Sequence, residues 1–120
     1  SLMEIVKLIG SDVLPDDQKL TLEIARVIRL GFLQQNAFHQ EDTCVPMEKQ
    51  FKMMEIILYL YEKSKALINR GMPVSVLKED NIFERIISIN YDVPNDQLNR
   101  FDQYQQDIDE FYNKVLEKNG

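Results

Sequence analysis

Apolar residues recur along this chain at spacings of three and four, which is the period of an amphipathic helix. The predicted helices cover residues 2–9, 15–33, 46–70, 82–89 and 95–118. The longest of them begins at Pro46 and is followed by Gly71, residue types that favour the start and the end of a helix. No segment alternates convincingly between apolar and polar residues, as a strand would. The expected fold is therefore all-α, a bundle of about five helices.

The same pattern predicts which face of each helix is buried. The expected buried face of helix 46–70 consists of Met47, Phe51, Met54, Leu58, Tyr61 and Ile68, broadened by Ile56, Ile57 and Leu60. Its methionines are interpreted as adaptable core packing. The expected buried stripe of the last helix consists of Leu98, Phe101, Tyr104, Ile108, Phe111, Tyr112 and Val115.

Helix 15–33 should bury Leu20, Ile24, Val27 and Ile28, because these residues share one face, which is widened by Leu22, Ala25 and Leu33. Glu23 and Arg26 are expected on the opposite face, where they can pair at a spacing of three residues.

Residues 32–39 are the most distinctive stretch, because two phenylalanines flank three consecutive carboxamides at the point where a helix gives way to a loop. Aromatic rings stack on planar heterocycles such as a nucleobase, and amides hydrogen-bond polar ring edges without adding charge. The same residues also suit a plain helix end, with Phe32 and Phe38 in the core and the amides on free carbonyls. From composition alone, the helix end is the simpler interpretation.

The composition narrows the classes of partner. The formal net charge of −6 argues against nucleic acid or an anionic membrane surface as the main partner. No apolar run approaches the ~20 residues of a membrane-spanning helix. The single cysteine, Cys44, excludes an internal disulfide and fits a reducing compartment.

Neither a catalytic residue nor a metal site is predicted from the residues. His39 has Glu41 and Asp42 nearby, but one histidine with two loop acids is more simply a solvated or loop-ordering residue. Cys44 lacks a second histidine that would activate it as a nucleophile, so it is interpreted as a packing residue.

Gly31 and three acids have two possible roles each. Gly31 either loosens the last turn of its helix or permits a close contact with another helix. The acids Asp12, Asp16 and Asp17 precede or begin a helix. They either stabilise this helix through the positive end of its dipole or contact a partner.

Three segments, taken together and in order, resemble the catalytic subunit of V/A-type rotary ATPases. They are LIGSDVLP at residues 8–15, KLTLEIAR at 19–26 and FLQQNAFH at 32–39. The similarity continues through Asp42-Thr43 and EKQFKM at 48–53. The region corresponds to the C-terminal helical domain of that subunit.

The resemblance implies that residues 1–120 form a single helical domain, a fragment of a longer subunit whose N-terminal β-barrel and central P-loop domain are not in this sequence. The full subunit would bind ATP or ADP with Mg²⁺ and couple hydrolysis or synthesis to H⁺ or Na⁺ transport. The fragment alone is expected to bind no cofactor and to be inactive.

In this family the phenylalanines of this loop form part of the adenine pocket. On matching positions, the resemblance nominates Phe32 and Phe38, with Gln34 and Gln35 in support. Gly31 departs from the family pattern, which usually has an acidic or longer polar residue there.

The segment around Asp12, Asp16 and Asp17 resembles the acidic helix–turn–helix tip that, in the related F-type catalytic subunit, contacts the central stalk. Gln18 replaces one acid of that tip.

The partners implied are the non-catalytic B subunit, the protein of the central stalk and the missing P-loop domain, in a cytoplasmic head peripheral to the membrane. Direct membrane insertion is not expected. The alternative is a free-standing helical interaction module with no nucleotide role, which would use its acidic last helix and its methionine-rich helix 46–70.

Overall fold

A computed structural model describes residues 13–33 and 46–119. The elements in chain order are α2 (Asp16–Ile28), the π-helix η2 (Arg29–Leu33), α4 (Met47–Asn69), α5 (Val74–Leu77), α6 (Ile82–Ile87), α7 (Ile89–Asp92), the 3₁₀-helix η3 (Leu98–Arg100) and α8 (Phe101–Asn119). Within the described residues there is no strand, so the all-α prediction is confirmed for them. The helix predicted over residues 2–9 and the loop predicted over residues 34–45 lie outside the described residues.

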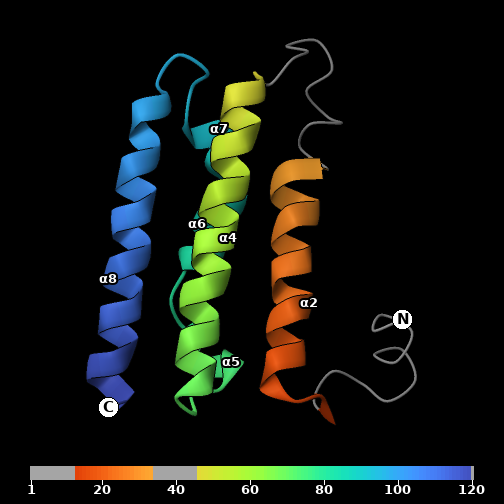
Figure 1. Ribbon diagram of the computed structural model, residues 1–120, viewed down its shortest axis with the longest axis vertical. Helices are drawn as coiled ribbons and strands as arrows, with labels where there is room; N and C mark the ends of the chain where they lie inside the picture. The colour runs from red at the N-terminus through yellow and green to blue at the C-terminus, as the bar shows by residue number, and fades with distance from the viewer. Residues whose placement is uncertain (1–12, 34–45, 120) are drawn as a thin grey trace.

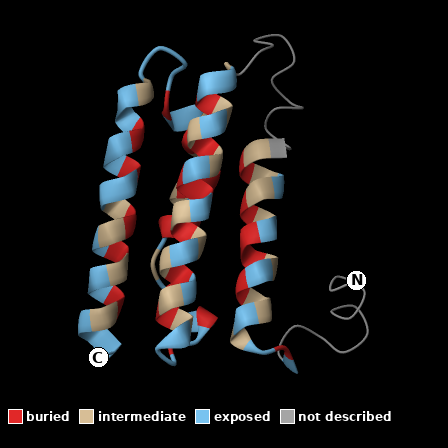
Figure 2. Cartoon of the chain, in the orientation of Figure 1, coloured by how far each residue is buried: buried red, intermediate tan, exposed pale blue. Residues whose placement is uncertain are grey.

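The three long helices lie side by side, with α4 between α2 and α8 (Figure 1). α2 runs antiparallel to α4, and α8 runs parallel to it. The short helices α5, α6 and α7 return the chain along the bundle, and α6 packs against both α2 and α8. Figure 2 shows the buried residues of α2 and α8 on the sides that face α4, so the three helices and the returning segment share one apolar core.

α4 ends in the glycine turn that the sequence predicts. Gly71 has a φ of +96°, in the left-handed region that only glycine adopts without strain. Its N–H donates to the carbonyl of Ile68 at 2.9 Å, and the N–H of Met72 donates to the carbonyl of Leu67 at 3.2 Å. This pair of bonds is a Schellman motif, which satisfies the last carbonyls of the helix and directs the chain into α5.

The prediction of the buried face of α4 was wrong for its central row but confirmed for Ile56, Ile57 and Leu60, which are buried. Met47, Phe51 and Leu58 are exposed. The other buried residues, which were not predicted, are Lys49, Met53, Ser64 and Leu67. Apolar residues occupy most of the circumference of α4, so periodicity alone could not select the face that α2, α8 and the returning segment cover. The methionine prediction holds for Met53 but not for Met47.

The later helices differ from the prediction in where they divide and begin. The fourth predicted helix is divided at Ser88 into α6 and α7. The last predicted helix does not begin at Asn95, because Gln97 has non-helical dihedral angles (φ −128°, ψ 47°). It begins at Leu98 with η3, which leads directly into α8. The predicted apolar stripe of this last helix is confirmed in its buried members Phe101, Tyr104, Ile108, Phe111 and Val115.

Candidate functional site

The predicted helix 15–33 extends to Leu33, but its last five residues form a π-helix. π-helices are rare and frequently occur at functional sites. Gly31 lies in this π-helix and is buried against α6. A Cβ atom on Gly31 would lie 3.0 Å from the Cα and 3.2 Å from the carbonyl oxygen of Ile87. Gly31 therefore permits a close contact between the end of α2 and α6, which is the second of the two roles considered for it.

Phe32 follows Gly31 and is the one predicted adenine-pocket residue among the described residues. Its side chain is half-buried and packs against the apolar core, so part of the ring surface stays accessible. Gln34, Gln35 and Phe38 lie outside the described residues. The ring is thus held from one side by the core, next to a backbone that is held by the Gly31–Ile87 contact.

The acids of the predicted stalk-contacting tip lie at the other end of α2. Asp16 is half-buried, and its Oδ1 accepts the backbone N–H of Val74 at 3.1 Å. Val74 is the first residue of α5, so Asp16 satisfies a donor that has no partner within that helix. Asp17 is exposed. Asp12 lies outside the described residues.

The two candidate regions are separated by the length of α2 (Figure 1). At about 1.5 Å per residue, the 13 residues of α2 span about 20 Å between the tip acids and the π-helix. One straight helix therefore joins Asp16 to the segment that presents Phe32.

The buried face of α2 is confirmed for Leu20, Ile24 and Val27, whereas Ala25 is exposed. Glu23 is buried, contrary to the prediction that it lies on an exposed face. Its carboxylate accepts hydrogen bonds from Arg26 at 2.8 and 3.1 Å and forms an ion pair with Lys78 at 3.4 Å. Burial raises the pKa of Glu23, but the hydrogen bonds and charges of Arg26 and Lys78 outweigh it, so the net pKa is below the ordinary value. Arg26 also bridges to Glu84 of α6 at 2.5 Å. The predicted Glu23–Arg26 pair is confirmed, but it belongs to a network between helices.

Lys49 is a second buried charge, and sequence reasoning missed it. Its Nζ donates to the carbonyls of Val93 at 2.6 Å and Asn90 at 3.2 Å, and to Oδ1 of Asn95 at 2.9 Å. These acceptors match the three N–H donors of an ammonium group. Burial lowers the pKa of the Lys49 ammonium. Lys49 therefore ties the start of α4 to the turn between α7 and α8. The position of a lysine within an otherwise apolar arc was the available signal.

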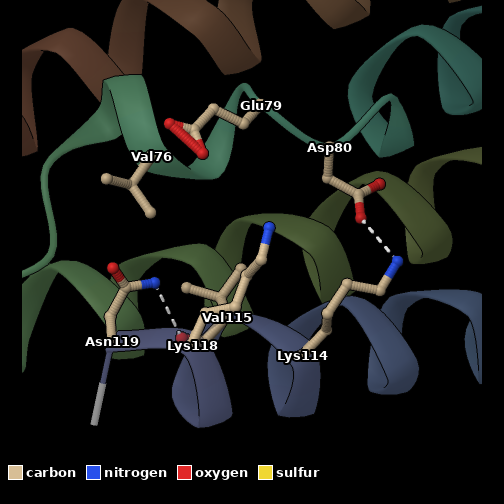
Figure 3. Close-up of a pocket in the computed structure, with 7 residues that line it drawn as sticks. All are labelled: Val76, Glu79, Asp80, Lys114, Val115, Lys118 and Asn119. Atoms are coloured by element: carbon tan, nitrogen blue, oxygen red, sulfur yellow. Dashed lines mark hydrogen bonds and ion pairs between the residues drawn. The ribbon is translucent and has the colours of Figure 1, made fainter.

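A shallow cleft lies between α8 and the α5–α6 connection (Figure 3). The residues that line it are Val76, Glu79, Asp80, Lys114, Val115, Lys118 and Asn119. Lys114 forms an ion pair with Asp80 at 3.3 Å across the cleft. The volume of the cleft, about 130 Å³, is well below the ~300 Å³ of the smallest typical ligand pockets, so the cleft does not suit a nucleotide.

No group of three histidine, cysteine or acidic side chains in the described residues could hold a metal ion. In the same part of the chain, no helix has both the length and the apolar character needed to cross a membrane.

A family model described as the C-terminal domain of V and A type ATP synthase matches residues 1–77 of the 120 residues. The chain belongs to this family. The match includes the whole of α2, the π-helix and α4, and therefore both ends of α2 discussed above.

Three relatives of this ATP synthase domain match nearly the whole chain. The V-type ATP synthase alpha chain 2 of Clostridium tetani is 44% identical over 117 residues, which are 98% of this chain and 20% of that protein. The V-type ATP synthase alpha chain of Halothermothrix orenii is 47% identical over 116 residues, 97% of this chain and 20% of the relative. The V-type ATP synthase alpha chain of Thermoanaerobacter sp. is 38% identical over 117 residues, 98% of this chain and 20% of the relative. The chain thus spans a fifth of the length of these proteins.

Proposed function

We propose that this domain acts within the catalytic subunit of a V/A-type rotary ATPase, where it completes the adenine side of a nucleotide pocket. The observation that carries the proposal is the half-buried ring of Phe32, at the end of a π-helix held against α6 through Gly31. A ring with a held backbone and an accessible surface can stack on a base with little loss of conformational freedom.

The chemistry of Phe32 fits the base of ATP or ADP and not its phosphates, because a phenyl ring offers a stacking surface and no positive charge. The phosphates and Mg²⁺ would be held by the P-loop domain of the same subunit. In this proposal the helical domain supplies one wall of the pocket, and the chemical step of hydrolysis or synthesis takes place on the other domain.

The test is Phe32→Ala in a full-length catalytic subunit within the assembled ATPase. Loss of base stacking, worth about 1–3 kcal/mol, should raise the KM for ATP by roughly 5- to 150-fold. Phe32→Tyr is the matched control, since it keeps an aromatic ring and should keep a KM near that of the wild type. An unchanged KM in the alanine variant would remove Phe32 from the pocket.

A second experiment uses the 120-residue chain by itself. One wall of a pocket should not overcome the free-energy cost of association, so calorimetry should detect no micromolar binding of ATP. Micromolar affinity would mean that the chain holds a complete site, and the proposal of a shared pocket would be wrong.

We also propose that the N-terminal end of α2 contacts the central stalk and transmits force along α2, in an enzyme that couples ATP turnover to H⁺ or Na⁺ transport alongside the B subunit. Asp17 is the exposed candidate, and its Oδ1 accepts the N–H of the adjacent Gln18 at 2.9 Å, whereas the half-buried Asp16 is hydrogen-bonded to Val74 of α5. Asp17→Asn should lower coupling in the assembled ATPase without lowering the Tm of the domain. Asp16→Asn, which keeps an oxygen for Val74, separates the contact role from the capping role. If neither variant changes coupling, both acids act only within the domain.

A further inference from the structure

α4 carries an exposed apolar row that the bundle does not cover. Met47, Phe51 and Leu58 are 78%, 66% and 53% exposed. They are separated by four and seven residues, so they lie on one face of the helix. Exposed apolar side chains that gather on one face, rather than occurring singly, mark interaction sites.

An acidic row runs beside the apolar one. Glu48, Glu55 and Glu62 are all exposed and are spaced by seven residues, so they form a line parallel to the apolar row. At about 100° per residue, this line lies at the edge of the apolar row and not on the opposite side of α4.

We propose that this face of α4 binds a partner helix whose apolar seam is flanked by lysine or arginine. We call it the α4 docking face; it consists of Met47, Phe51, Leu58, Glu48, Glu55 and Glu62.

The spacings of four and seven residues in the apolar row and of seven in the acidic row favour a helix as the occupant, because two packed helices bring residues at such spacings into repeated contact. The acidic row favours a basic flank, since opposite charges across an interface select the partner and speed association. A second copy of this chain would place acidic rows and two net charges of −6 near each other, and an anionic membrane would meet the same repulsion.

The test uses the 120-residue chain and two synthetic peptides, stapled so that they remain helical monomers. Both peptides carry the same leucine seam, flanked by lysine in one and by glutamate in the other. Fluorescence anisotropy at low ionic strength should show binding of the lysine peptide only, weakened by added salt. Phe51→Ser with Leu58→Ser should reduce its affinity by roughly tenfold or more, because anchor residues at the centre of an interface dominate its affinity. These exposed positions should leave the Tm unchanged.

Charge reversal supplies the second variant. Glu48→Lys, Glu55→Lys and Glu62→Lys together should invert the preference, so that the glutamate peptide binds.

The matched control reverses three exposed acids of α8, Asp102→Lys, Glu110→Lys and Glu117→Lys, with the same change in net charge. This control should keep the preference for the lysine peptide.

Three results would overturn the proposal. The first is that neither peptide binds. The second is that the α8 control inverts the preference as fully as the α4 variant, which would show a general effect of net charge. The third is self-association of the chain that Phe51→Ser abolishes, which would make a second copy the occupant. None of these results bears on the adenine pocket, which is tested through Phe32.

Discussion

Replacing Lys49 by methionine is the most informative single perturbation of this domain. Methionine keeps most of the buried apolar stem of the lysine and removes the ammonium group. The carbonyls of Asn90 and Val93 and the amide oxygen of Asn95 then lose their shared donor. Val93 is fully buried, so water does not readily replace the lysine at its carbonyl.

Two opposing effects set the magnitude. Hydrogen bonds to a charged group contribute about 1.5–3 kcal/mol each, so three of them give roughly 5–9 kcal/mol in total. Removing the ammonium also stabilises the folded state, because the burial of this charge costs several kcal/mol. We expect a net loss of about 2–4 kcal/mol, a large part of the ~5–15 kcal/mol that stabilises a typical domain. At about 4 °C per kcal/mol for a chain of this length, the Tm should fall by roughly 8–16 °C.

The assay is urea denaturation followed by circular dichroism at several pH values. Burial lowers the pKa of Lys49 in the folded state below the ordinary 10.5. Between these two pKa values the unfolded chain binds more protons than the folded chain, so stability rises with pH. Below the lowered pKa both states are protonated and this contribution is constant. The stability difference between wild type and Lys49→Met should therefore widen as the pH rises through this window towards 10.5.

Lys52→Met is the matched control, because Lys52 is half-buried in the same helix. Its free energy of unfolding should stay within ~0.5 kcal/mol of the wild type. If Lys49→Met were as stable as wild type, the ammonium would not hold the α7–α8 turn as described. If the difference narrowed with rising pH, the folded-state pKa of Lys49 would be raised and not lowered, and burial would not dominate its titration.

Two further substitutions test the packing of α2. Gly31→Ala should lower the free energy of unfolding by about 1–3 kcal/mol, because its methyl group would press on the backbone of Ile87; an unchanged Tm would contradict the close contact. Glu23→Gln should cost about 1–3 kcal/mol at neutral pH, because Arg26 and Lys78 lose their buried carboxylate. Since the folded-state pKa of Glu23 is below the ordinary 4.5, its contribution is present above 4.5 and is lost as the pH falls through the lowered value. Urea titrations at pH 7 and pH 3 should therefore show the two proteins converging in acid, and a constant difference would count against the ion pairs.

The start and the end of α4 could be predicted because their signals are local. Proline before α4 and glycine after it act through their own dihedral angles, so the predicted bounds agree with Met47–Asn69. Family membership could also be predicted, because the order of short segments survives in the sequence whatever the tertiary structure. The candidate site was predicted only through that resemblance, and of its four adenine-pocket residues only Phe32 is described by the structure.

The buried face of α4 and the partners of the buried charges depend on residues that are far away in the chain. Lys49 meets its acceptors 41 to 46 residues later, and Arg26 meets Glu84 58 residues later. The pattern of residues within one helix does not show which residues so far along the chain will contact it. The sequence by itself determined which segments are helical and to which family they belong, because both depend on local order. The buried side of α8 was also predicted, because its apolar stripe is narrow. On α4, where apolar residues occupy most of the circumference, only the tertiary structure decided which side is buried, because neighbouring helices and not periodicity exclude water from a face.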